Sequence, residues 1–320
     1  MNWLSDNKVR QLLSVADEPD FAHTPYCLIR QIAQGGMGTI FLARDTRLDR
    51  DVAIKVLNTS EMSAGMIERM RREAFIIASL EHAGIVPIHD LGQLADGRVF
   101  YVMKYVRGKH LDEYLNSEIS LNDRLRLFRT SCEAVAFAHA HGIVHRDLKP
   151  ENIMVGSFGE VLVMDWGIAK LRDELDPSLA ATQKPKSSNT SHGTILGTPE
   201  FMSPEQARGE SSKVDERSDV YGLGAILKFL LSTTSPRLNV PRRLEAIFKC
   251  AMAESPALRY SNARELALEI DRFLDGNPVN AYRENLLERI VRWSSQHKVL
   301  LLLVLTYLLL RTILILVLGR

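Results

Sequence analysis

The sequence has few of the features that mark secreted, zinc-binding or nucleic-acid-binding proteins. Its 320 residues contain only three cysteines, which are far apart and lack Cys-x-x-Cys spacing. Neither a disulfide framework nor a zinc site is therefore indicated. The net charge is +1, which gives no reason to expect nucleic acid as a partner. Residues 1–21 have mixed polarity without an apolar core, so no signal peptide is expected.

The overall composition is that of a globular protein. Hydrophobic residues make up 46% of the chain and charged residues 25%, which is enough apolar surface for a sizeable core. No internal repeat is visible. We therefore expect one folded unit, with an appendage where the composition changes after residue 275.

A short polar loop carries the most specific chemistry in the sequence. Residues 145–152 read HRDLKPEN, and Asp-Trp-Gly follows at 165–167. The loop lies between a helical pattern and short apolar runs that are typical of strands. A loop with an Asp, a Lys and an Asn at these spacings is suited to charged oxygens and a metal ion. We interpret it as a phosphoryl-transfer site.

The chemistry of phosphoryl transfer explains these residue types. The reaction needs a carboxylate beside the acceptor hydroxyl and cations that hold the spreading negative charge. Asp147 suits the carboxylate role, and Lys149 returns to the same side of an extended segment, where it can meet the phosphate. Asn152 and Asp165 offer hard oxygen ligands of the kind that Mg²⁺ prefers. A lone Asp is more often a turn residue, so the interpretation depends on the joint pattern.

The two motifs resemble the catalytic and metal-binding loops of the Hanks-type, eukaryotic-like protein kinases of bacteria. In that family Lys149 is associated with Ser/Thr specificity, and the D-W-G variant resembles the membrane-anchored members. The resemblance implies an α+β fold with a small β-rich N-lobe and a larger helical C-lobe. It also implies transfer of the γ-phosphate of ATP to Ser or Thr of proteins, with Mg²⁺, or alternatively Mn²⁺, as the metal.

The resemblance covers about residues 26–274 and sets the boundaries that we expect. The connection at 232–240 is shorter than in relatives, which place another docking helix there, so substrate recognition is left open. In chain order we expect an N-terminal extension at 1–24, the kinase domain at 25–275 (N-lobe 25–105, C-lobe 106–275), a basic juxtamembrane linker at 276–298 and a transmembrane helix at 299–318.

A glycine-rich segment between two strand-like runs indicates a phosphate-binding hairpin, because glycine lets backbone N–H groups approach phosphate oxygens. Gly-Gly is a common turn, but the V-A-I-K phrase at 52–55 follows at a suitable distance. Ala33 replaces the first glycine of the family pattern, so we expect altered nucleotide affinity rather than its loss. Met103 alone would be ordinary core. The ATP-binding residues that the resemblance implies are Ala33, Gln34, Gly35, Gly36, Met37, Gly38, Ile40, Ala53, Lys55, Met103, Tyr105 and Val106.

Lys55 needs a carboxylate partner to hold it over the phosphates. Residues 63–80 have helical spacing, and by resemblance Glu73 within them pairs with Lys55. Glu68, one turn earlier, is the rival. The plain alternative is that Glu73 lies on a solvated face.

The polar segment from 168 to 205 resembles a kinase activation segment, although its composition alone indicates only a flexible loop. By resemblance, Thr198 contacts the catalytic Asp and Lys near the substrate hydroxyl. A phosphate on this segment can pair with the guanidinium of Arg146. We expect autophosphorylation at Thr190 or Thr194, which makes a second copy of the chain a partner in trans, as a dimer.

Several further residues are expected to be structural. By resemblance, Asp219 accepts backbone N–H bonds from the catalytic loop, and Arg259 forms a buried ion pair with Glu205. His139 and His141 have no acidic or cysteine neighbour at ligand spacing, so we interpret them as helix-end residues rather than metal ligands.

Residues 299–318 are strongly apolar and contain one charge, Arg311. Their length matches the roughly 20 residues that cross a bilayer, and a buried core helix is the alternative. Arg311 costs roughly 2.5–3.5 kcal/mol if central, which the leucines outweigh. Basic residues before the run favour a cytoplasmic kinase domain. We expect a single-pass inner-membrane protein that contacts lipid. Either the apolar run serves as an anchor and dimerisation surface, or this chain is shortened relative to its relatives.

The sequence thus predicts an active, membrane-tethered Ser/Thr protein kinase that acts on protein substrates. The rival from another class is a catalytically weak, nucleotide-binding pseudokinase that acts as a scaffold. Ala33 and the D-W-G variant favour it, but Lys55, Asp147 and Asp165 are all retained. A small-molecule kinase is disfavoured by the Gly-Thr-Pro-Glu phrase at 197–200.

Overall fold

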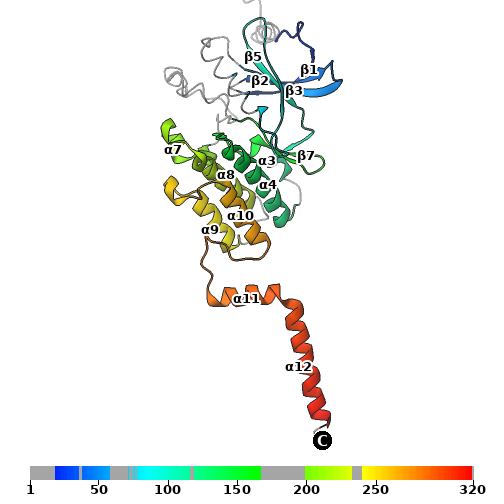
Figure 1. Cartoon of the computed structure of the whole chain (residues 1–320), viewed down its shortest axis with the longest axis vertical. Helices are drawn as coiled ribbons and strands as arrows, with labels where there is room; N and C mark the ends of the chain where they lie inside the picture. The colour runs from blue at the N-terminus through cyan, green and yellow to red at the C-terminus, as the bar shows by residue number, and fades with distance from the viewer. Residues whose placement is uncertain are drawn as a thin grey trace, which may run out of the picture.

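The structure is a computed structural model of the chain. It describes residues 19–35, 38–57, 71, 75, 78–115, 119–166, 199–232 and 240–318. Figure 1 shows a sheet-rich part above a helical part, with two further helices extending away from the helical part. The predicted α+β fold with two lobes is confirmed. The predicted N-terminal extension lies mostly outside the described residues.

The N-lobe contains one antiparallel five-stranded sheet with the strand order β1-β2-β3-β5-β4. Alternation along the central strand β3 explains its place, because successive side chains point to opposite faces. Ile54 and Val56 belong to the outer apolar cluster with Phe100, whereas Ala53 and Leu57 belong to the core shared with the C-lobe. The strands are β1 (Tyr26–Gly35), β2 (Gly38–Asp45), β3 (Arg50–Leu57), β4 (Ile88–Gln93) and β5 (Val99–Lys104).

The same alternation places Lys55 on the face that looks toward the C-lobe. Strand β4 begins at Ile88 and ends at Gln93. Pro87 precedes it and has no N–H for a sheet ladder. Ile85 instead forms an isolated parallel bridge with Val163, which ties the N-lobe to the strands beneath the catalytic loop.

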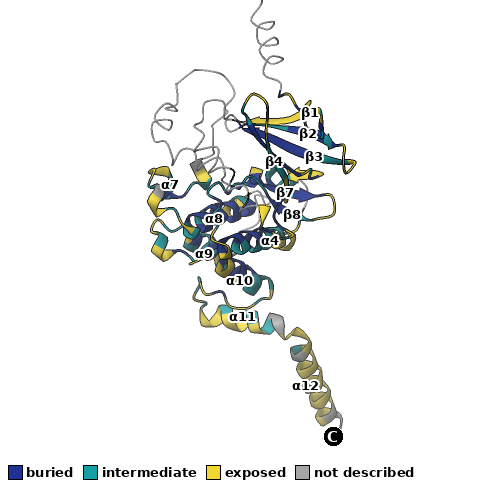
Figure 2. Ribbon diagram, turned by 45° about the horizontal axis from the view of Figure 1, so that its top comes forward, coloured by how far each residue is buried: buried dark blue, intermediate teal, exposed yellow. Residues whose placement is uncertain are grey.

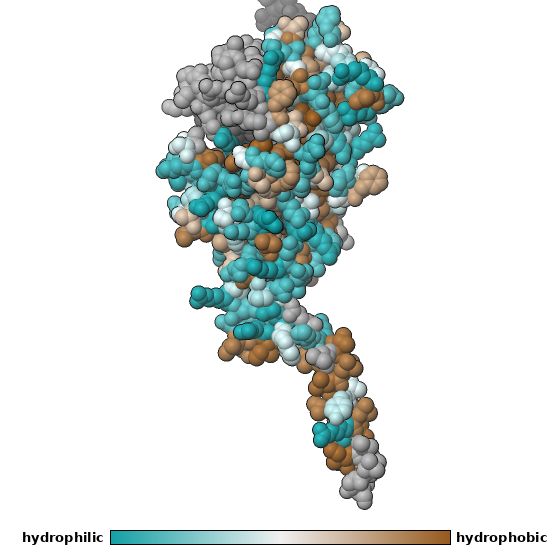
Figure 3. Space-filling model, viewed as in Figure 1, coloured by the Kyte–Doolittle hydropathy of each residue, from teal (hydrophilic) through white to brown (hydrophobic). Residues whose placement is uncertain are grey.

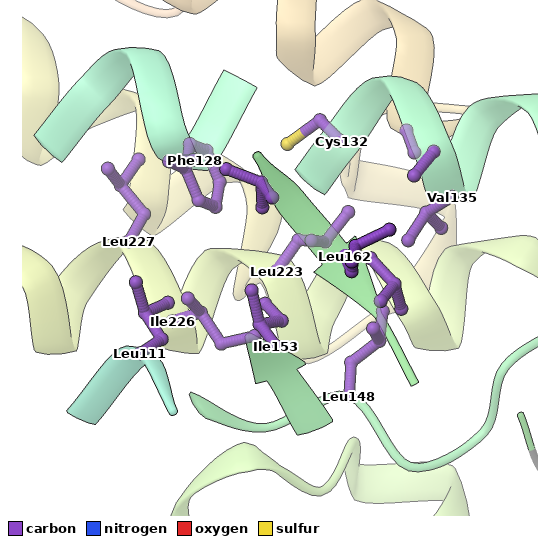
Figure 4. Close-up of a cluster of buried hydrophobic side chains, with 14 of the residues drawn as sticks. Leu111, Phe128, Cys132, Val135, Leu148, Ile153, Leu162, Leu223, Ile226 and Leu227 are labelled. Carbon is purple, nitrogen blue, oxygen red and sulfur yellow. The ribbon is translucent and has the colours of Figure 1, made fainter. Parts of the chain in front are cut away.

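The C-lobe is built around two long helices, α4 (Leu121–Ala140) and α8 (Glu216–Ser232), which α9 (Arg242–Ala251) and α10 (Ala263–Leu274) cover. Ser120 caps α4 by accepting the backbone N–H of Asp123, which satisfies an otherwise orphan donor. Helix α8 is largely buried (Figure 2), and its buried face is apolar from Val220 to Leu231. Figure 4 shows side chains from both long helices meeting those of the short strands.

A small antiparallel sheet lies between the lobes and completes this core. Its order is β6-β7-β8, and Ile153 and Leu162 from it pack with Leu223 of α8 (Figure 4). Because β7 directly follows the catalytic loop, this buried strand fixes the position at which the loop ends. The remaining short elements are β6 (Gly108–His110), α3 (Leu111–Tyr114), β7 (Ile153–Gly156), β8 (Val161–Val163) and α7 (Pro204–Ala207).

Helix α8 ends at Ser232 and α9 begins at Arg242. Most of the connection between them, residues 233–239, lies outside the described part of the chain, so its predicted shortness relative to relatives stays a prediction. After α10 the structure contains α11 (Leu286–Gln296) and α12 (Lys298–Leu318). The predicted linker at 276–298 therefore includes a helix that the sequence analysis did not anticipate. Within the described residues, no helix is both long and apolar enough to qualify as a membrane span. The predicted transmembrane helix is thus not confirmed.

Candidate active site

The catalytic loop brings three of the predicted site residues together. The Asn152 amide donates to the Asp147 backbone oxygen at 2.7 Å and to its Oδ2 at 3.2 Å. The Lys149 ammonium lies 3.5 Å from the same Oδ2. Asn152 is buried, whereas about a quarter of each of the other two side chains is accessible. The loop therefore presents a carboxylate and a cation to solvent on a buried amide support.

His145 connects this loop to the segment that carries Asp165. Its ring is fully buried, and burial lowers the pKa of His145, so the imidazole is neutral. Nε2 lies 2.8 Å from the Met164 carbonyl oxygen, and Nδ1 lies 3.2 Å from the Asp147 N–H. A neutral ring satisfies both contacts only if Nε2 carries the proton and Nδ1 accepts. In this tautomer, His145 connects Met164, which precedes Asp165, to Asp147 through two hydrogen bonds.

Asp219 of α8 fixes the backbone that precedes Asp147. Its two carboxylate oxygens accept the N–H groups of His145 at 2.6 Å and of Arg146 at 2.8 Å, which confirms the role expected of Asp219. Arg146 has φ 67° and Asp165 has φ 54°. A non-glycine residue in this region costs about 1–3 kcal/mol and persists only where its surroundings impose it. For Arg146, the two hydrogen bonds that Asp219 accepts impose this backbone conformation.

His139 has a larger role than a helix-end residue. It is buried near the end of α4, and its Nε2 lies 2.9 Å from Asp219 Oδ2. It therefore supports the carboxylate that holds the catalytic loop. Its place one helical turn after the apolar Val135 was the available signal, because that spacing puts His139 on the buried face of the helix.

Asp219→Asn should lower the free energy of unfolding by about 1.5–3 kcal/mol, because the amide places an N–H against a backbone N–H that needs an acceptor. We also expect a lower kcat with little change in the KM for ATP. Urea unfolding and steady-state kinetics measure both. The matched control is Asp215→Asn, since Asp215 is exposed and its carboxylate accepts the N–H of Arg217 at the start of the same helix. Equal effects of the two substitutions would contradict this role of Asp219.

Lys55 reaches across from the N-lobe to Asp165. Its Nζ lies 2.8 Å from Asp165 Oδ1, and the Tyr101 hydroxyl lies 3.5 Å from the same oxygen. Burial alone would lower the pKa of Lys55, but the adjacent Tyr101 and Asp165 outweigh it and raise the pKa. The ammonium therefore stays charged at the junction of the lobes. Sequence reasoning missed Tyr101, whose burial raises its own pKa to about 12.

A cavity lies beside this ion pair. Met103, one of the ATP-binding residues that the family resemblance implies, is buried and lines the cavity together with Tyr101 and Asp165. Trp166 closes another side, with its ring 4.7 Å from that of His145. The D-W-G tryptophan is thus packed inward. Tyr105 and Val106 follow β5 directly, where the chain passes from the N-lobe to the C-lobe.

The predicted phosphate-binding hairpin is formed by β1 and β2. Ala33 pairs with Ile40, and Gly35 pairs with Gly38. Gly38 has φ 151°, and a Cβ there would collide with the carbonyl oxygen of Val56. Only glycine fits this position, because the hairpin backbone approaches β3 so closely. Ala53 lies opposite Met103 in the β3–β5 ladder, beneath this hairpin.

Several predicted residues lie outside the described part of the chain. The predicted pairing of Lys55 with Glu73 therefore stays a prediction, as do the contacts of Thr198. The others are Gly36, Met37, Thr190 and Thr194.

The donor set fits a hard divalent cation. Because the Asn152 amide N–H groups point to Asp147, its Oδ1 is turned away from that carboxylate and is available as a metal ligand. Asp165 supplies carboxylate oxygens from the facing segment, and oxygen ligands of this kind suit Mg²⁺. Within the described residues, no cluster of three or more His, Cys, Asp or Glu side chains has metal-binding geometry.

A buried ion pair fixes the end of the predicted activation segment. Arg259 donates to Glu205 through Nη1 at 2.7 Å and Nη2 at 2.9 Å, which confirms the pair expected from the sequence. Ser203 begins α7 with a capping box completed by Gln206. Gln206 also donates to the Arg146 carbonyl oxygen at 2.8 Å. The pair therefore positions a helix that touches the catalytic loop.

Comparison with known proteins agrees with this geometry. The sequence model of the protein kinase domain matches residues 26–287. The serine/threonine-protein kinase PknD of Chlamydia felis is 33% identical over 295 residues, covering 79% of this chain and 31% of the relative. PknB of Mycolicibacterium smegmatis, also called a serine/threonine-protein kinase, is 36% identical over 277 residues, covering 77% of this chain and 42% of the relative.

Comparison with solved structures gives the same fold. The crystal structure of the Mycobacterium tuberculosis PknI kinase domain aligns with a TM-score of 0.58 at 23% identity, covering 78% of this chain and 96% of that chain. The chain spans less than half the length of the curated relatives described above. The matched region contains the catalytic loop, Lys55 and Asp165. This chain belongs to the protein kinase domain family.

Proposed function

We propose that the protein is a serine/threonine protein kinase that transfers the γ-phosphate of ATP to Ser or Thr hydroxyls of proteins. The observation that carries this proposal is the convergence of Asp147, Lys149 and Asn152 on one loop, opposite the Lys55–Asp165 pair. Curated relatives at 33–36% identity are named serine/threonine-protein kinases. Lys149 in the catalytic loop favours the same specificity.

Each side chain then has a distinct role. Asp147 orients the acceptor hydroxyl and takes up its proton, because its carboxylate is partly accessible and fixed by Asn152. Lys149 and Lys55 neutralise phosphate charge from the two sides of the site. Asn152 and Asp165 hold the metal ion. Bound Mg²⁺ supplies charge neutralisation and orientation of the phosphates.

The pseudokinase alternative is not favoured. A scaffold of that kind would normally lack Lys55, Asp147 or Asp165, and the structure has all three in one site. A small-molecule kinase is disfavoured by the activation segment and by the family match.

Lys55→Met should reduce phosphoryl transfer by roughly 10- to 150-fold, because the loss of a hydrogen-bonded charge is worth about 1.5–3 kcal/mol. The measurement is transfer of labelled phosphate from Mg-ATP to a generic basic protein and to the chain itself. The control is Lys104→Met, since Lys104 is an exposed lysine at the end of the adjacent strand β5. ATP binding without transfer by the unaltered chain would shift the proposal to the scaffold.

Autophosphorylation at Thr190 or Thr194 belongs to the same proposal. Arg146 precedes Asp147 in the catalytic loop and could pair with a phosphate on the activation segment. In this reaction one copy of the chain would be the substrate of a second copy.

We also propose that the kinase is held at the inner membrane by residues 299–318, with the kinase domain in the cytoplasm. This proposal is supported by the exposed apolar side chains of α12, such as Leu303 at 60% and Leu309 at 61% exposure. Basic residues that precede the helix favour the cytoplasmic side. In fractionated cells we expect the chain in the membrane pellet after a high-salt wash, and a variant that ends at Arg283, before α11 and α12, in the supernatant. Recovery of the full chain in the supernatant would count against attachment.

A further inference from the structure

The helix between the kinase domain and α12 has an uncovered apolar side. Helical spacing places the large apolar residues of α11 on one face, because positions three and four apart share a face. All five are exposed, by between 49% and 79% of their surfaces. An apolar surface of this extent marks an interaction site. These residues, the α11 apolar face, are Leu286, Leu287, Ile290, Val291 and Trp293.

The opposite side of α11 is attached to the C-lobe by polar contacts. The Tyr282 hydroxyl donates to Glu288 at 3.0 Å, and Arg242 of α9 lies 3.8 Å from the same carboxylate. Arg292 donates to Glu284 at 2.9 Å and to the Gly276 carbonyl oxygen at 3.4 Å. Glu288 and Arg292 are four residues apart and therefore share the face that is turned toward the body.

A second set of contacts connects these residues to the folded core. Arg243 of α9 lies 3.8 Å from Glu284 and stacks over Phe273 of α10 at 4.9 Å. The buried carboxylate of Glu269 accepts the Ala281 N–H at 3.0 Å. Asn285 begins α11 with a capping box that uses Glu288, which fixes the start of the helix. The orientation of α11 relative to the C-lobe is thus specified by side chains.

The surroundings of the α11 apolar face indicate what covers it. Figure 3 shows hydrophobic surface along the lower side of α11 that continues onto α12. Figure 1 shows α11 lying across the direction of α12 rather than along it. A helix of this kind, with Trp on its apolar side and arginines beside it, is typical of the membrane interface. Arg283, Arg289 and Lys298 are exposed, and cationic side chains beside such a helix attract anionic lipids.

We infer that α11 is a membrane-surface helix that buries its apolar face at the boundary between the headgroups and the acyl chains of an anionic bilayer and so fixes the orientation of the kinase domain relative to the bilayer. This inference rests on the proposed membrane attachment. Its consequence is that the C-lobe is held close to the membrane through Arg243, Glu284 and Arg292. The active site then faces away from the lipid, because it lies at the other end of the C-lobe (Figure 1).

The experiment uses the full chain reconstituted in vesicles of neutral and anionic phospholipids. The chain has three tryptophans, so the fluorescence of Trp293 is obtained as the difference from Trp293→Phe. With lipids brominated on their acyl chains, the Trp293 component should be blue-shifted and should lose most of its intensity. Ile290→Asn together with Val291→Asn should abolish this quenching while the protein still floats with the vesicles. Phe158→Asn, at an exposed apolar side chain outside α11 and α12, should leave it in place.

The outcomes separate this inference from the proposal on which it rests. Protein that floats with vesicles but shows unquenched Trp293 emission overturns the surface-helix inference and leaves membrane attachment intact. Protein that does not float overturns both. Trp293 that is shielded from brominated lipid and from aqueous acrylamide alike also overturns it, since a second copy of the chain would then cover the face.

Discussion

Asp147→Asn should reduce the rate of phosphoryl transfer by roughly 10²- to 10⁴-fold, the range expected for loss of a general base. The substitution keeps the size of the side chain and removes its charge and its proton acceptor. Asp147 Oδ2 receives the Asn152 amide at 3.2 Å and lies 3.5 Å from Lys149 Nζ. The asparagine can keep the first contact through its oxygen, so the loop should remain folded. The loss should therefore appear in kcat rather than in the KM for ATP.

The matched control for this prediction is Glu151→Gln. Glu151 is an exposed carboxylate in the same loop, and its substitution makes the same chemical change four residues away. We expect its rate to stay near that of the unaltered chain. Labelled phosphate transfer measures both variants, and circular dichroism checks that both are folded. A residual rate for Asp147→Asn within a few-fold of the control would exclude Asp147 as the base.

The contacts that could be predicted from the sequence are those in which both partners belong to recognisable sequence motifs. Asp219 follows Ser218 at the start of an apolar helix, and Glu205 and Arg259 lie in short motifs, so their pairing did not require coordinates. The structure has both sets of contacts. Burial makes such polar groups depend on one particular partner, since an unpaired group inside the protein is costly.

The contacts that could not be predicted depend on how separate elements pack. A charged residue such as Arg124 is usually found at the protein surface. The structure buries it, and it donates to the Leu115 and Leu230 carbonyl oxygens. Only the close approach of α4 and α8 creates that environment. The Lys55–Asp165 contact is similar, because it depends on the relative position of the two lobes and on the conformation of Asp165.

The helix α11 was missed for a different reason. Its apolar residues have helical spacing, but the arginines among them and the change in composition were interpreted as a linker. Its capping box with Asn285 and Glu288 is a local signal that was present in the sequence. Boundaries outside the family resemblance therefore had to be judged from local patterns alone.

Arg259→Ala should lower the free energy of unfolding by about 3–5 kcal/mol, because it leaves the Glu205 carboxylate buried without its partner. Both side chains are at most 1% exposed. Arg259 also donates to the carbonyl oxygens of Arg217 and Glu254, which lose a donor as well. Urea unfolding at neutral pH measures the change. Lys249→Met, which breaks an exposed pair with Glu245, should cost less than about 1 kcal/mol.

The pH dependence of the same pair gives a second, independent test. Burial alone would raise the pKa of Glu205, but hydrogen bonds from Arg259 and Ser218 outweigh it and lower the pKa to about 2. A carboxyl whose pKa is lower in the folded state stabilises the fold above its unfolded pKa, and that contribution is lost as the pH falls toward 2. Without Arg259, burial raises the pKa of Glu205. Acidification then protonates this buried carboxylate, which reduces the destabilisation of the variant. The stability difference between the two proteins should therefore shrink between neutral pH and pH 4, whereas a difference that grows on acidification would show that Glu205 does not depend on Arg259.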